Sequence, residues 1–135
     1  MKLELSGILK FTELEIPPRV REEANLASLE SGLKILSEEK RHVTLLHQSL
    51  TKGLKGIDLS SIQLPRLSFD ETTVILIEDS ERKTVRVVLG PKDQGTLDEW
   101  MEDFRKQHLP SVVLPPREYH ISWANLTGLP GDSVK

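Results

Sequence analysis

The sequence predicts an α+β fold in one domain covering residues 1–135. A chain of 135 residues with 37% hydrophobic and 29% charged residues is typical of one globular domain. Segments with helical spacing of apolar residues are interspersed with segments rich in β-branched residues. Two of the β-rich runs, 73–77 and 84–89, are separated only by a polar stretch, which predicts an antiparallel hairpin. This mixture favours helices packed on antiparallel sheets.

The first segment, residues 3–16, is expected to be extended because apolar residues alternate with polar ones at Leu3 and Leu5 and again at Leu14 and Ile16. Gly7 interrupts the alternation and indicates a bulge or a close approach of another backbone. Pro17 and Pro18 stop the strand and open a helix.

The predicted first helix spans residues 19–38, where leucines recur at helical spacing. These leucines are Leu26, Leu29, Leu33 and Leu36. A short strand is expected at 42–47, followed by a weaker helix near 49–60.

The second half is expected to contain the hairpin, one helix and a final strand. The polar residues Glu78–Lys83 would form the connection of the hairpin. Thr96 and Glu99 have the spacing of a capping box, which predicts that a helix begins there. Its apolar face would comprise Leu97, Trp100, Met101, Phe104 and His108. The last strand is predicted over 119–126.

The composition argues against several classes of function. The net charge is −3, which disfavours a protein that binds duplex DNA or an anionic membrane through bulk positive charge. The chain has no cysteine, which excludes disulfides and thiolate chemistry. No apolar run approaches the about 20 residues of a membrane span, and the N-terminus does not resemble a secretion signal. We therefore expect a cytoplasmic protein.

One short pattern occurs twice. His42-Val43-Thr44 and His120-Ile121-Ser122 both read histidine, β-branched apolar residue, hydroxyl residue, and each is followed by another apolar residue. Side chains alternate between the two faces of a strand. Each strand would therefore present an imidazole beside a hydroxyl on one surface, with the apolar residues facing a core.

These residue types suit the cleavage of a phosphodiester. If the two strands lie side by side, two histidines can act as general base and general acid. The hydroxyls of Thr44 and Ser122 can donate hydrogen bonds to phosphoryl oxygens. The pattern does not tell which histidine is the base. The alternative is that His42 and His120 are structural histidines with satisfied hydrogen bonds.

Other polar residues give weaker signals. His47 lies on the opposite strand face from His42, and His108 is best explained as a cation at a helix C-terminus or a residue at the core edge. Arg41 precedes His42 and points to the opposite face. No spacing typical of a metal or cofactor site is present, so neither is expected.

The two motifs resemble the paired His-apolar-Ser/Thr-apolar motifs of the 2H phosphoesterase superfamily, which includes the LigT-like RNA ligases and cyclic phosphodiesterases. The segment from Tyr119 to Val134 also resembles small phage and bacterial members, the Swiss-army-knife RNA-repair-like proteins, near which the phage anti-CBASS phosphodiesterases belong. Many members have threonine where this chain has Ser122, and the chain is shorter than typical LigT-like members.

The resemblance implies a two-lobed fold, with antiparallel sheets around a cleft and helices packed outside. It implies a metal-independent phosphodiesterase, with His42 and His120 as the acid/base pair and Thr44 and Ser122 as phosphate-binding hydroxyls. Its substrate would be a 2′,3′-cyclic phosphate RNA end, a 2′–5′ linkage or a cyclic oligonucleotide. A monomer is expected, in the host cytoplasm if the gene belongs to a phage.

Two rival interpretations follow from the same residues. A non-catalytic module could bind RNA or nucleotides in the same cleft, and its binding would survive replacement of the histidines. A purely structural protein would have no nucleotide affinity and would lose stability on His42→Ala.

Overall fold

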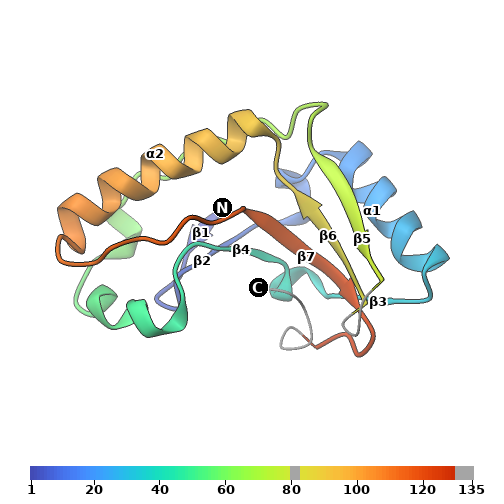
Figure 1. Cartoon of the computed structure of the whole chain (residues 1–135), viewed down its shortest axis with the longest axis horizontal. Helices are drawn as coiled ribbons and strands as arrows, with labels where there is room; N and C mark the ends of the chain where they lie inside the picture. The colour runs from blue at the N-terminus through green and yellow to red at the C-terminus, as the bar shows by residue number, and fades with distance from the viewer. Residues whose placement is uncertain (80–82, 130–135) are drawn as a thin grey trace.

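The computed structural model in Figure 1 shows an α+β protein whose strands form one antiparallel sheet. The structure describes residues 1–79 and 83–129. Within these residues the sheet has seven strands in the order β1-β2-β4-β7-β6-β5, and β3 pairs with the end of β7. The strands are β1 (Lys2–Leu3), β2 (Ile8–Lys10), β3 (Lys34–Ile35), β4 (His42–Thr44), β5 (Val74–Glu78), β6 (Thr84–Val88) and β7 (His120–Asn125). The predicted α+β class is confirmed.

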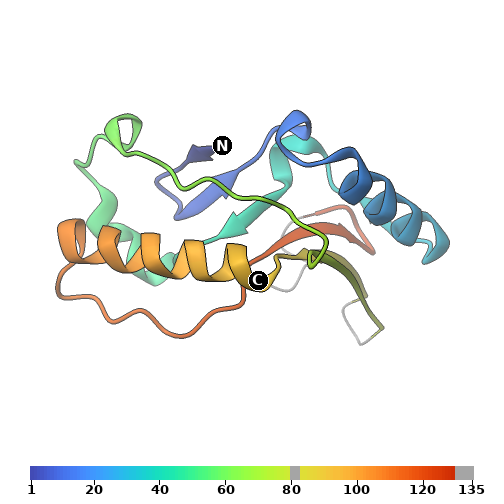
Figure 2. The same cartoon turned by 90° about the horizontal axis from the view of Figure 1, so that it is seen from above.

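Two α-helices and four short 3-10 helices accompany the sheet in the described residues. They are α1 (Pro18–Glu30), α2 (Pro91–His108), η1 (Glu13–Glu15), η2 (Glu38–Lys40), η3 (Gln48–Leu54) and η4 (Leu59–Ser61). Helix α1 packs against β5 and β6 at one end of the molecule, and α2 extends towards the other end (Figures 1 and 2).

The N-terminal segment is a tight hairpin and not the single long strand that the alternation predicts. Gly7 lies at the turn with a φ of +79°, a left-handed conformation that favours glycine. Its carbonyl accepts hydrogen bonds from the backbone N–H groups of Leu45 (2.9 Å) and Leu46 (3.1 Å). A Cβ at Gly7 would lie 2.9 Å from the Cβ of Leu46. The predicted close approach is therefore present, and it holds β2 beside β4.

Helix α1 begins where the two prolines predict, but it ends at Glu30, eight residues before the predicted end at 38. Gly32, with a φ of +68°, turns the chain into β3, and Leu36 then donates its N–H to the carbonyl of Trp123 (2.8 Å). The predicted apolar face is also wrong. Leu26 and Leu29 are exposed, and the buried positions of α1 are Val20, Ala24 and Ser28. These residues recur every four positions, which brings one face of the helix onto the sheet.

Helix α2 starts five residues before the predicted capping box. Pro91 occupies its first turn and Gly90 is its N-cap, because a proline has the backbone angle of a first helical residue and has no N–H to satisfy. Thr96 is inside the helix, where its hydroxyl donates to the carbonyl of Lys92 (3.0 Å). The buried residues Leu97, Met101 and Phe104 agree with the predicted apolar face.

The remaining elements match the sequence prediction in part. The segment near 49–60 forms 3-10 helices in place of a weak α-helix. Strands β5 and β6 form the predicted antiparallel hairpin, in a register that runs from Val74 opposite Val88 to Glu78 opposite Thr84. Residues 80–82 of its predicted connection lie outside the described residues. The final strand is β7, at the predicted position.

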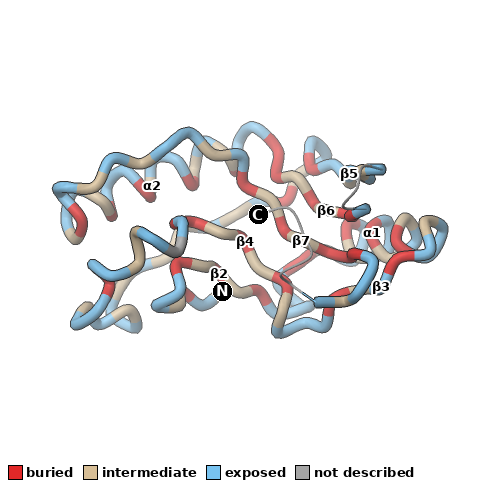
Figure 3. The backbone as a smooth tube through the Cα atoms, turned by 60° about the horizontal axis from the view of Figure 1, so that its bottom comes forward, coloured by how far each residue is buried: buried red, intermediate tan, exposed pale blue. Residues whose placement is uncertain are grey.

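The core lies on one face of the sheet. Leu9, Val43, Val87 and Ile121 come from four neighbouring strands, and each of these side chains is 0% exposed. Along β4 and at the start of β7, buried residues alternate with half-buried ones (Figure 3). The half-buried positions form a second, polar face, which carries the histidine motifs.

Candidate active site

Strands β4 and β7, which carry the two motifs, lie side by side and run antiparallel. Val43 is the register partner of Ile121. In an antiparallel ladder, each step forward on one strand corresponds to a step back on the other. His42 therefore lies opposite Ser122, and Thr44 lies opposite His120. The hydroxyl of each motif is the cross-strand neighbour of the imidazole of the other motif.

The four polar residues share one face of the sheet, and their apolar neighbours share the other. His42, Thr44, His120 and Ser122 are each half-buried, whereas Val43 and Ile121 are fully buried. The structure therefore brings all four predicted site residues together. Cβ atoms directly opposite each other on neighbouring strands are about 4.5–5.5 Å apart, and diagonal neighbours are about 7–8 Å apart. The two histidines are diagonal neighbours across the two strands.

The ring of His42 is oriented by the backbone that precedes it. Its Nδ1 lies 3.0 Å from the carbonyl oxygen of Lys40, the last residue of η2. A carbonyl oxygen only accepts hydrogen bonds, so Nδ1 must carry the proton in this contact. In the neutral ring the lone pair is then on Nε2, which makes Nε2 the nitrogen that can accept a proton.

Two cationic residues border the four, one on each side. Lys10 on β2 is the register partner of His42. On β6, a register shift between Val85 and Arg86 places Arg86 opposite Ser122. Neither residue could be assigned to the site from the sequence, because only the pairing of the strands shows that they share the polar face with the histidines.

Arg41 has a structural role on the opposite face, as strand alternation predicts. Its side chain is 8% exposed, and its guanidinium lies 4.2 Å from the centre of the Trp123 ring and 3.1 Å from a carboxylate oxygen of Glu13. Trp123 is itself fully buried and donates its indole N–H to Asn25 Oδ1 (2.8 Å). Trp123 is therefore a core residue, as predicted, and its indole is not exposed for base stacking.

The other two histidines have local roles. His47 caps η3, because its Nδ1 accepts a hydrogen bond from the backbone N–H of Ser49 (3.2 Å). His108 is the last residue of α2, and its ring lies 4.9 Å from that of Phe104. This is the core-edge position at a helix C-terminus that the sequence indicates.

Residues 1–79 and 83–129 contain no group of three His, Asp or Glu side chains that could hold a metal ion. In the same residues, neither α-helix combines the length and the apolar character that a membrane crossing requires.

No family model matches this chain, and no curated protein or solved structure shows significant similarity. The resemblance of the two motifs to the 2H phosphoesterases therefore stays a prediction from the sequence. The part of that resemblance that covers residues 130–134 lies outside the described residues.

Proposed function

We propose that the protein is a metal-independent phosphodiesterase that acts on RNA-type phosphodiesters through His42 and His120. The observation that supports this most strongly is the register of Val43 opposite Ile121. It follows from this register that two imidazoles and two hydroxyls occupy four adjacent positions on one face. Two structural histidines would not need this arrangement.

The proposed reaction cleaves the phosphodiester with two proton transfers, one to His42 and one from His120. Nε2 of His42 accepts a proton from a ribose 2′-hydroxyl or from water, whose oxygen then attacks phosphorus. His120, in its protonated form, gives a proton to the oxygen that leaves as the phosphorus–oxygen bond breaks. The hydrogen bond from Nδ1 of His42 to Lys40 supports the assignment of His42 as the base, because it leaves the lone pair on Nε2.

The two hydroxyls would stabilise the charge that develops on the phosphoryl oxygens. Thr44 and Ser122 can each donate one hydrogen bond to a non-bridging oxygen. Each lies opposite the histidine of the other motif, so a phosphate between the histidines can reach both hydroxyls. This cross-strand arrangement gives one hydroxyl donor beside each proton-transfer group.

The two-lobed 2H architecture is the finer fold that we propose for the sheet. One half would comprise β1, β2 and β4, and the other β7, β6 and β5. Strands β4 and β7 lie at the boundary, so each half contributes one histidine motif to it. The substrate would bind over this boundary.

The candidate substrates are a 2′,3′-cyclic phosphate end, a 2′–5′ linkage and a cyclic oligonucleotide second messenger, the last as for the anti-CBASS enzymes. A panel of cyclic di- and trinucleotides, 2′,3′-cyclic nucleotides and 2′–5′ oligomers, incubated with a chelator and resolved by mass, tests the proposal. We expect a product from at least one class.

The His42→Ala variant distinguishes the catalytic, the binding and the structural interpretations. A catalytic site predicts that His42→Ala abolishes product formation in a folded protein. If no substrate in the panel gives product but nucleotide binding persists in His42→Ala, the non-catalytic binding module is correct. If His42→Ala unfolds the protein and no nucleotide binds, the structural interpretation is correct.

A further inference from the structure

A row of cationic side chains leads away from His42 across the sheet. Lys10 on β2 pairs with His42, and Lys2 on β1 pairs with Lys10. Register partners point to the same face, so both lysines lie on the polar face. Neighbouring strands are about 4.8 Å apart, which places the backbones of Lys10 and Lys2 about 5 and 10 Å from that of His42.

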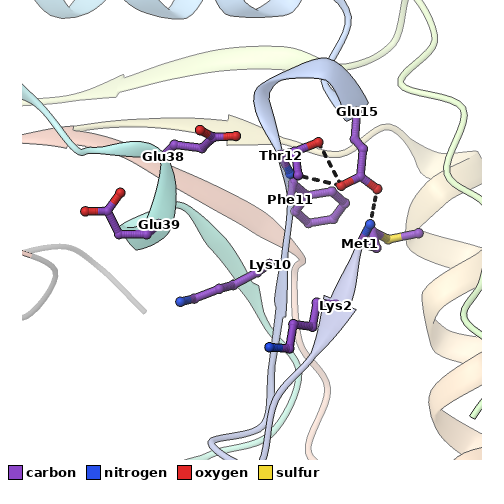
Figure 4. A pocket seen from close by; sticks show the side chains of 8 residues that line it. All are labelled: Met1, Lys2, Lys10, Phe11, Thr12, Glu15, Glu38 and Glu39. Atoms are coloured by element: carbon purple, nitrogen blue, oxygen red, sulfur yellow. Dashed lines mark hydrogen bonds and ion pairs between the residues drawn. The ribbon is translucent and has the colours of Figure 1, made fainter. Parts of the chain in front are cut away.

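A pocket of about 310 Å³ opens beside this row (Figure 4). Lys2 and Lys10 line it from the strands, and Glu38 and Glu39 line it from η2. The last residue of η2 is Lys40, whose carbonyl orients His42. One wall of the pocket is therefore the segment that sets the position of the proposed base. The volume is at the lower end of the range for small-molecule sites, which is about 300–1,000 Å³.

The charges in the pocket suit a nucleotide unit. Two ammonium groups can bind a phosphate, as lysines commonly do in phosphate sites. Glu39 faces the same space, and hydrogen bonds from its own backbone N–H and from the side chain of Ser37 hold the pKa of its carboxyl below its usual value. A carboxylate only accepts hydrogen bonds, so it can bind a ribose hydroxyl or the amino group of a base.

The ion pair of Lys10 is weak enough for a phosphate to replace it. Lys10 Nζ lies 3.4 Å from Glu4 Oε1, and the two side chains are 33% and 28% exposed. Water screens a pair of this kind strongly. The cation on the other side of the motif strands differs, because Arg86 is 16% exposed and its Nη2 lies 3.0 Å from Glu78 Oε2. The side chain of Lys10 is therefore more accessible to a substrate phosphate than that of Arg86.

We infer that this pocket binds the nucleotide unit next to the cleaved phosphodiester, with Lys10 and Lys2 on its phosphate and Glu39 on its ribose or base. The inference rests on the proposed function, because it takes the phosphate between His42 and His120 as the reacting group. The substrate then extends from the histidines over β2 and β1. It carries at least one phosphate besides the one that is cleaved.

Binding of linear triadenylate tests this without requiring catalysis. The measurement uses the His120→Ala variant, in which cleavage is slow, with and without Lys2→Gln and Lys10→Gln. We expect the double lysine change to weaken binding at least tenfold. The slope of the logarithm of affinity against the logarithm of salt concentration should fall by about 0.7 for each lysine removed, the value for a single-strand phosphate contact. Lys55→Gln, at an exposed lysine after η3, is the matched control.

Kinetics on two substrates separate this inference from the proposed function. One substrate is adenosine 2′,3′-cyclic phosphate, and the other is triadenylate ending in the same cyclic phosphate. The double lysine change should lower kcat/KM at least ten times more for the trinucleotide, chiefly through KM. If product forms, and if the double lysine variant binds triadenylate and turns over both substrates as Lys55→Gln does, the pocket inference alone is overturned. Lysine-dependent binding with no product from any substrate would overturn the proposed function and leave the pocket as a nucleotide-binding site without cleavage.

Discussion

Val43 on β4 lies directly opposite Ile121 on β7, and both side chains are 0% exposed. A slip of one residue in either strand would turn a histidine into the core and an apolar side chain to the polar face. Burial of this apolar pair therefore fixes the register that aligns the polar residues. The arrangement of the candidate site is a consequence of the packing on the opposite face.

Tyr119, the single tyrosine of the chain, gives a test of the packing beside this site. Its side chain is buried, and burial together with the nearby Asp98 raises its pKa from 10.0 to about 12. The tyrosine of the unfolded chain ionises near pH 10. The contribution of Tyr119 to the free energy of unfolding is therefore complete below pH 10 and is lost as the pH rises towards 12. A shift of this size corresponds to about 2–3 kcal/mol.

Tyr119→Phe should therefore lose less stability than the wild type between pH 10 and pH 12. Denaturant unfolding of both proteins across this range measures the difference. Absorbance of the tyrosinate follows the titration of the one tyrosine directly. A midpoint near pH 10 in the folded protein would show that the ring is accessible to water.

Product formation should continue in EDTA, provided that the substrate panel gives a product. An acid/base pair of two imidazoles needs no metal ion to activate the attacking oxygen. Turnover before and after dialysis against the chelator is the measurement. An activity that disappears with EDTA and returns with one particular divalent ion would contradict the mechanism.

The polar face could be predicted only in part from the sequence. Alternation along a strand is local, so it correctly predicts that His42 and Thr44 point one way and Val43 the other. The neighbours of a strand depend on long-range pairing. For this reason Lys10 and Arg86 could not be assigned to the site before the register was known.

The errors in the helices have a similar cause. The leucine spacing over 26–36 suggested one long amphipathic helix, but Gly32 ends it and Leu36 is buried from an extended segment. The spacing records which residues are apolar and does not tell which of them reach the core. At the second helix, Pro91 sets the start, although Thr96 and Glu99 have the local pattern of a cap.

The hydroxyls of Thr44 and Ser122 should contribute to turnover and little to the fold. Thr44→Val and Ser122→Ala should each slow single-turnover cleavage by about 10- to 1,000-fold if the hydroxyls donate to a developing oxyanion. Thr84→Val is the matched control, because the Thr84 hydroxyl is buried on β6 without a hydrogen-bond partner among the described residues. Rates near the wild type for both site variants would show that their hydroxyls serve packing.

The two histidines should produce a bell-shaped dependence of rate on pH. The base must be neutral and the acid must be charged. His42→Ala should remove the acidic limb, because His42 is the proposed base, and His120→Ala should remove the alkaline limb. Each change should lower the rate about a hundredfold or more.

Three comparisons make the histidine prediction specific. The double variant should lose much less than the product of the two single losses, because an acid and a base that act in one step are not additive. The fold should persist, since the half-buried imidazoles cover little apolar surface compared with Val43 or Ile121. His47→Asn, which keeps a good N-cap for η3, should leave the profile unchanged. A rate that does not depend on pH, or histidine variants that unfold yet keep their specific activity, would show that His42 and His120 have a structural role.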